Sequence, residues 1–144
     1  MSLGRVINVE SAGKERLQLT RAIVVAMREL SQQSDLDEQT RDLAAFIALA
    51  LEEIAGTIDI SVAAWEKRGY WVKADRFRMD WIWTENLGAV MRKAVVTEDW
   101  ATVARTIGQV GEKLSGLKVP QRNRIGTPWI GARKQLDANR SPHR

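Results

Sequence analysis

The chain has 144 residues, a formal net charge of +4 and no cysteine. This length suits one domain that buries a hydrophobic core of its own. The lack of cysteine excludes disulfide bonds, thiolate zinc sites and cysteine nucleophiles within this sequence.

The basic charge is concentrated towards the C-terminal end. Residues 118–144 hold seven basic residues and one acidic residue, a net charge of +6, whereas residues 1–117 carry −2. All three prolines also lie after residue 118. We therefore expect a helical bundle over residues 1–117 and a basic, partly ordered tail over residues 118–144.

Two long helices are predicted in the first half of the chain. Apolar residues at helical spacing predict a helix over about residues 12–33, with Ser11 as its cap. A second helix is predicted over about residues 35–68, and Ser34 or Asp35 can cap it.

The third helix follows a turn at Gly69 and is rich in tryptophan. At 100° per residue its apolar side chains fall into two separate stripes, where a surface helix usually has one. The first stripe holds Tyr70, Ala74, Phe77, Trp81, Gly88 and Val95. The second stripe holds Val72, Met79, Trp83, Leu87, Val90 and Ala94. Two stripes indicate packing partners on both sides of this helix.

The second stripe is the predicted interaction surface, and its candidate residues are Val72, Met79, Trp83, Leu87 and Val90. Aromatic and methionine side chains beside arginines are typical of an interface core. We expect a homo-oligomer, with a dimer favoured, and Trp83→Glu should then weaken self-association without unfolding the helices. The alternatives are ordinary burial and a pocket for an apolar ligand. Trp65, Trp81 and Trp100 are expected to be core anchors.

A fourth helix is predicted after a cap at Thr97, with apolar residues from Trp100 to Leu117 in the heptad pattern of bundle packing. Thr127 and Pro128 then predict a short helix over about residues 128–138, which Trp129, Ile130 and Leu136 would dock. Short connections favour an all-α fold, an antiparallel up-down four-helix bundle with a short C-terminal helix.

The tail is also a candidate contact for phosphate or nucleic acid. The residues that would make this contact are Arg122, Arg124, Trp129, Arg133 and Lys134. Cations neutralise phosphates and an aromatic ring stacks on a base, as in single-strand binders. The bland alternative is a solubilising end, because no motif that enters a groove accompanies the charge.

Catalytic chemistry has little support in the sequence. The only histidine is His143, which leaves no histidine-based triad and no di-iron site. A magnesium-dependent phosphate-ester hydrolase remains an alternative, because magnesium can bind through one or two helix carboxylates plus substrate phosphates. The candidate carboxylates are Glu53, Asp59, Glu66, Asp75, Asp80 and Glu85. We otherwise expect no metal, no cofactor and no enzymatic activity.

A cytoplasmic protein without membrane contact is expected. The amino terminus lacks the apolar core of a signal peptide. The longest uncharged apolar run, residues 43–51, is too short to span a bilayer.

The sequence AWEKRGYWVKADRFR, together with GRVINV before it and TPWIGARKQL after it, resembles a group of small all-helical bacterial proteins without an assigned activity. The resemblance implies a helical fold and a bacterial origin, and it adds no functional residue. Our reading is a non-catalytic helical-bundle interaction protein that self-associates through its third helix.

Overall fold

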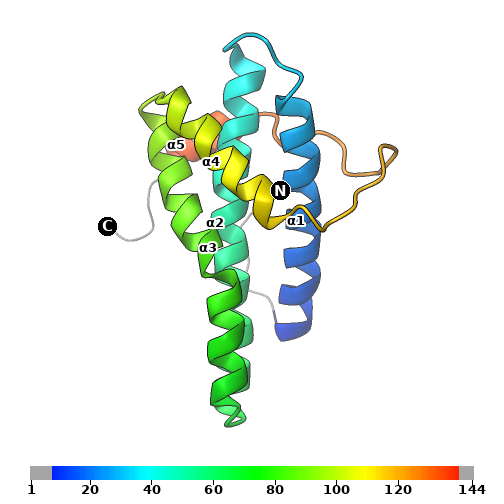
Figure 1. The fold of residues 1–144 in the computed structure, drawn as a ribbon, viewed down its shortest axis with the longest axis vertical. Coiled ribbons are helices and arrows are strands. Elements are labelled where there is room, and N and C mark those ends of the chain that lie inside the picture. The colour runs from blue at the N-terminus through cyan, green and yellow to red at the C-terminus, as the bar shows by residue number, and fades with distance from the viewer. Residues whose placement is uncertain (1–7, 140–144) are drawn as a thin grey trace.

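The computed structural model describes residues 8–139 and folds them into helices joined by short connections (Figure 1). Five helices lie in this part of the chain: α1 (Val9–Leu30), α2 (Glu38–Lys67), α3 (Trp71–Val96), α4 (Trp100–Lys113) and α5 (Ala132–Ala138). The all-helical class and the short C-terminal helix are therefore confirmed. Residues 1–7 and 140–144, which the predicted bundle and tail include, lie outside the described residues.

The centre of the core is α2. Every residue from Asp42 to Leu51 is buried, and four of these ten residues are alanines. Small side chains let neighbouring helices approach from several sides, and α1, α3 and α5 all pack on α2. In Figure 1 the chain reverses between α1 and α2 and again between α2 and α3, whereas α4 crosses the other helices obliquely.

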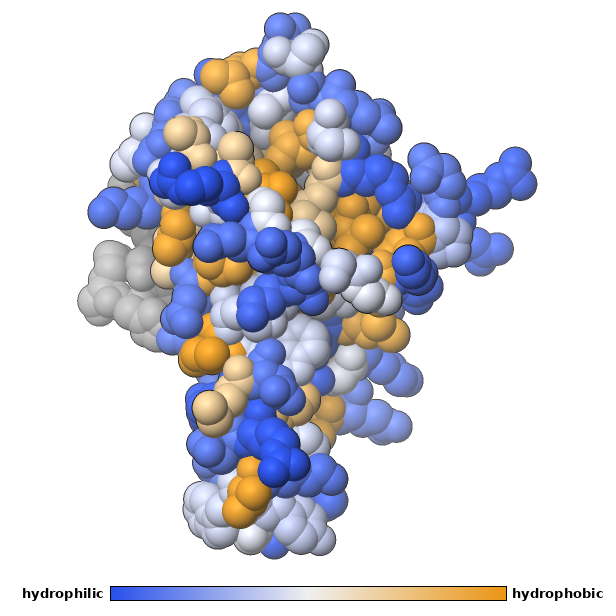
Figure 2. All heavy atoms as spheres, in the orientation of Figure 1, coloured by the Kyte–Doolittle hydropathy of each residue, from blue (hydrophilic) through white to orange (hydrophobic). Residues whose placement is uncertain are grey.

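The α2–α3 hairpin projects beyond the end of α1, and Figure 2 shows it as the narrow end of the molecule. The turn is a Schellman motif: the amide of Tyr70 donates to the carbonyl of Trp65 (2.9 Å), and the amide of Gly69 donates to that of Glu66 (2.9 Å). Gly69 has φ +81°, a conformation that glycine adopts without a steric penalty. The predicted turn is confirmed.

The predicted helix caps are wrong by a few residues. The cap positions are occupied by Asn8, Asp37 and Asp99. The side chain of each accepts a hydrogen bond from the backbone amide of the residue three positions later. Asn and Asp are as good as Ser and better than Thr at this position. Thr97 instead follows the last residue of α3, and the fourth helix ends at Lys113 rather than near Leu117.

The segment after α4 is packed on the bundle. Val119, Trp129 and Leu136 are buried, as expected for Trp129 and Leu136, and the latter two belong to the main core cluster. Ile130 is wrong as a docking residue, because it is 73% exposed. The short helix begins at Ala132 instead of residue 128, because residues 128–131 form turns.

Candidate functional site

One face of α3 is committed to the core. Its buried residues include Ala74 near the start of the helix, followed by Thr84, Gly88, Met91 and Val95 at steps of four, three and four residues. Trp65, Trp81 and Trp100 also pack against a core cluster, as predicted. The position of this buried face determines which side of α3 faces away from the core.

The opposite face of α3 forms the outer stripe, a line of exposed side chains from Val72 to Val96. Its apolar members are Val72 (74% exposed), Met79 (69%), Ile82 (39%), Val96 (46%) and the exposed Ala89. Its polar members, Asp75, Asn86 and Lys93, are also exposed. Since every member is exposed, no described part of the chain covers this stripe.

The sequence-predicted interface is only partly on this surface. Val72 and Met79 belong to the outer stripe, and Val90 lies beside it with 43% exposure. Trp83 and Leu87 are partly buried against the main core cluster, and the Trp83 ring stacks on Trp81 at a centroid distance of 6.2 Å. These two side chains therefore contact the core on one side and keep part of their surface exposed to solvent.

Sequence reasoning missed Ile82, Ala89 and Val96. The signal that could have found them is the alternation of three- and four-residue steps, which runs without a break from Val72 to Val96. Polar residues at three of these positions hid the pattern from a search for apolar side chains alone.

Arg16 of α1 fastens the hairpin to the body of the molecule. Its Nε donates to Thr57 Oγ1 (3.2 Å) and its Nη2 donates to Ser61 Oγ (2.8 Å), both on α2. Its guanidinium also lies over the rings of Phe77 (5.0 Å) and Trp81 (5.8 Å) on α3. Burial lowers the pKa of Arg16, but an arginine stays protonated at neutral pH. This side chain therefore links α1 to both helices of the hairpin.

Aromatic and basic residues gather at the hairpin tip. Tyr70 is 53% exposed and Trp71 is 63% exposed, so the turn presents both rings to solvent. The Lys73 ammonium lies 5.2 Å from the centroid of the Trp65 ring. Figure 2 shows apolar and charged side chains side by side on this end of the molecule.

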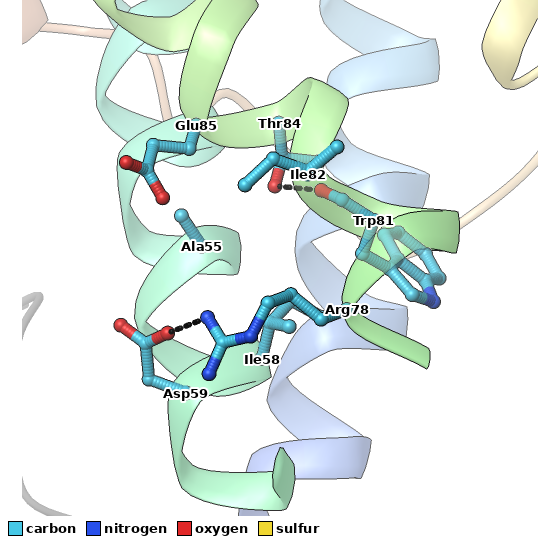
Figure 3. A pocket seen from close by; sticks show the side chains of 8 residues that line it. All are labelled: Ala55, Ile58, Asp59, Arg78, Trp81, Ile82, Thr84 and Glu85. Atoms are coloured by element: carbon cyan, nitrogen blue, oxygen red, sulfur yellow. Dashed lines mark hydrogen bonds and ion pairs between the residues drawn. The ribbon is translucent and has the colours of Figure 1, made fainter. Parts of the chain in front are cut away.

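A shallow groove between α2 and α3 holds two of the candidate metal carboxylates, Asp59 and Glu85 (Figure 3). Arg78 lies between the helices and its Nη1 is 3.5 Å from Asp59 Oδ1. Asp59 is therefore paired with a cation. Within residues 8–139 there is no group of three or more histidine, cysteine, aspartate or glutamate side chains that could hold a metal ion.

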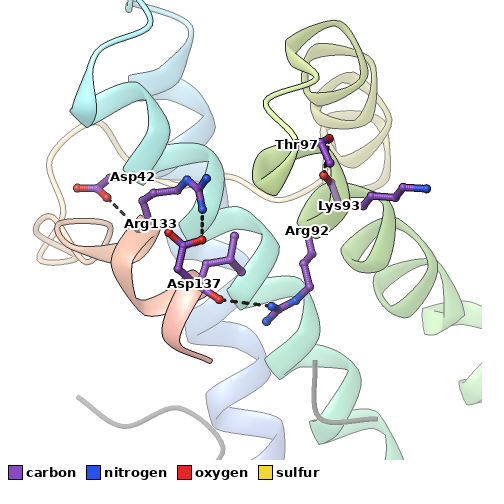
Figure 4. A network of polar contacts seen from close by, with 7 residues as sticks. Asp42, Arg92, Lys93, Thr97, Arg133 and Asp137 are labelled. Carbon is purple, nitrogen blue, oxygen red and sulfur yellow. Dashed lines mark hydrogen bonds and ion pairs between the residues drawn. The ribbon is translucent and has the colours of Figure 1, made fainter. Parts of the chain in front are cut away.

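Asp42 of α2 and Arg92 of α3 hold α5 on the bundle through hydrogen bonds to its backbone, and Arg92 donates to the carbonyl of Leu136 (3.5 Å) (Figure 4). Asp42 accepts the amides of Gly131 (3.0 Å) and Arg133 (2.9 Å), which caps the N-terminus of α5 from α2. Arg92 of α3 donates to both carboxylate oxygens of Glu52 (2.6 and 2.9 Å), and this hydrogen bonding raises the pKa of Arg92. The next side chain on α3, Lys93, points away from this network (Figure 4).

The structure separates the predicted nucleic-acid contacts. Arg122, Arg124 and Lys134 are exposed and have no ion pair with any described residue. Trp129 is 3% exposed within the core, and Arg133 pairs with Asp137. The exposed charge of the segment is thus available, whereas its aromatic ring is not available for stacking.

No known protein family, characterised protein or solved structure matches this chain. The resemblance to small bacterial proteins stays an expectation. In the described part of the chain, no helix is both long and apolar enough to cross a bilayer. The site must therefore be interpreted from its own geometry.

Proposed function

We propose that this protein is a non-catalytic interaction module that self-associates through the outward face of α3. The observation that supports this proposal is the outer stripe, where Val72, Met79, Ile82 and Val96 stay 39–74% exposed on a helix whose other face packs on α2. Several exposed apolar side chains along one face of a helix are typical of a binding surface, whereas single ones are ordinary.

The free energy gained by burying these side chains predicts a complex whose formation depends on protein concentration. Burying the exposed part of one valine or methionine side chain contributes about 1–2 kcal/mol. Four such side chains on each of two copies contribute on the order of 10 kcal/mol, which is close to the cost of association, about 4–15 kcal/mol. The complex is therefore expected to form over a measurable range of protein concentration.

Light scattering coupled to size-exclusion chromatography tests the proposal. The wild-type protein is expected to approach twice the mass of the chain as its concentration rises, and Met79→Glu is expected to remain monomeric because it would bury a charge in the interface. Leu17→Glu is the matched control, since Leu17 is 50% exposed but lies on α1. A wild-type monomer at every concentration, or equal effects of both variants, contradicts the proposal.

Nucleic-acid binding by the basic segment is the second candidate, and the exposed and unpaired Arg122, Arg124 and Lys134 support it. Because Trp129 is buried, the contact would be electrostatic and would weaken steeply with salt. Fluorescence anisotropy with a labelled oligonucleotide tests this candidate. Loss of binding in a variant with all three cations replaced by glutamine supports it, and binding that ignores salt contradicts it.

A further inference from the structure

We infer that two copies of the chain pair antiparallel through their outer stripes, centred at the level of Thr84. This inference rests on the proposed self-association and adds the orientation and register of the two helices. It follows from the spacing, size and charge of the outer-stripe residues.

The spacing of the stripe is symmetric about its centre. From Val72 to Val96 the steps alternate between three and four residues and read the same in both directions. In antiparallel coiled coils each a position lies opposite a d position of the partner helix, and this stripe satisfies that rule along its whole length. Val72 then faces the partner's Val96, and Met79 faces the partner's Ala89.

The sizes of the paired side chains are complementary. Met79 is long and flexible, and opposite it the partner's Ala89 leaves room for it. The two valines at each end form an apolar contact of equal size. Near the centre Ile82 lies beside the partner's Asn86, and a polar residue in such a seam specifies register at some cost in affinity.

The charges decide between the two possible orientations. Asp75 and Lys93 lie equally far along the helix from Thr84, on either side of it. Antiparallel pairing therefore brings Asp75 opposite the partner's Lys93, and Lys93 opposite the partner's Asp75. Parallel pairing would instead bring aspartate to aspartate and lysine to lysine. Within the described chain neither side chain has an ion pair or hydrogen bond, so both are available for the partner. The charge pattern thus favours antiparallel pairing and opposes the parallel alternative.

Antiparallel pairing has a geometric consequence that cysteine cross-linking can detect. The two copies of residue 79 would lie ten residues apart in level, about 15 Å at the rise of an α-helix. Residue 79 of one copy and residue 89 of the other would lie at the same level. A disulfide needs Cα atoms within about 7 Å, so only the second pair can form one.

The test uses Met79→Cys and Ala89→Cys in the full chain, which has no other cysteine. Each variant is oxidised alone and in an equimolar mixture, and cross-linked dimers are measured on a non-reducing gel. We expect cross-linking in the mixture, with at least ten-fold less when either variant is oxidised alone. Leu17→Cys on α1 is the control for random collisions, because it is an exposed position outside the stripe.

Each other outcome has a definite meaning. Efficient cross-linking of Met79→Cys with itself would overturn the antiparallel orientation. If light scattering finds a dimer but the mixture forms no cross-link beyond the Leu17→Cys control, the register is wrong while self-association stands. If the protein is monomeric and no cross-link forms, this inference fails together with the proposed function.

Discussion

Gly88 lies where α3 packs tightly against α2, and replacing it with alanine tests that packing. A Cβ atom at this position would lie 3.2 Å from Leu51 Cβ and 3.5 Å from the backbone nitrogen of Glu52. Leu51 is fully buried, so it has little room to move away. Alanine gains about 1 kcal/mol of helix propensity over glycine, whereas overpacking a core costs about 1–3 kcal/mol. We expect Gly88→Ala to lower the free energy of unfolding by about 1 kcal/mol.

Gly56→Ala is the matched control, because Gly56 is exposed within α2 and nothing lies within 4 Å of an added Cβ. This variant keeps the propensity gain alone and should raise the free energy of unfolding by about 1 kcal/mol. Urea unfolding followed by circular dichroism measures both variants against the wild type. If Gly88→Ala is as stabilising as Gly56→Ala, the close approach of α2 and α3 at Gly88 is refuted.

Three further changes test the core and the caps. Asp42→Ala removes both hydrogen bonds that cap α5 and should lower the free energy of unfolding by about 2–3 kcal/mol, with faster hydrogen exchange at Gly131; unchanged exchange would contradict the docking. Hydrogen bonds from Thr102 lower the pKa of the Asp99 carboxyl in the folded protein below its ordinary value of 3.8. The ionised carboxylate therefore stabilises the fold above pH 3.8, and this contribution is lost as the pH falls through the lowered pKa of the folded state. Asp99→Asn keeps an acceptor but cannot titrate, so its melting temperature should fall less than that of the wild type between pH 7 and pH 2, and equal falls would refute the role. Trp83→Glu should now lower the unfolding midpoint, since the ring stacks on the core, and wild-type stability would contradict that placement.

Local patterns in the sequence predicted much of the fold. The period of apolar residues indicated all four long helices, and Gly69 marked the turn because a single residue with positive φ is enough to reverse the chain. These features depend on residues within a few positions of one another, which is why sequence spacing reveals them.

Long-range contacts could not be predicted in this way. Arg16 meets Thr57 and Ser61 more than forty positions later, and Asp42 caps a helix that begins ninety positions further on. No local pattern indicates either pairing. Trp129 lies in a segment of prolines, glycines and cations, and although the sequence predicted that it docks a short helix, only the packing shows that it joins the main core cluster.

Of the five residues predicted to form an interaction surface, three are exposed and two are partly buried. Val72 and Met79 are exposed because they lie on the face of α3 opposite its buried residues. Trp83 and Leu87 are partly buried because the rest of the bundle packs against that side of α3. The angle between the two apolar stripes alone could not indicate which of their residues the bundle covers.

The most direct test of the paired outer stripes is a charge exchange between Asp75 and Lys93, measured by sedimentation velocity. Asp75→Lys alone and Lys93→Asp alone each turn both ion pairs of the dimer into like-charge contacts. At about 0.2–1 kcal/mol for each attraction lost and each repulsion gained, the dissociation constant should rise about ten-fold. An equimolar mixture of the two variants restores opposite charges at both contacts, so it should dimerise like the wild type at a concentration where each variant alone is monomeric. Equal dimerisation of both single variants, the mixture and the wild type would contradict the account.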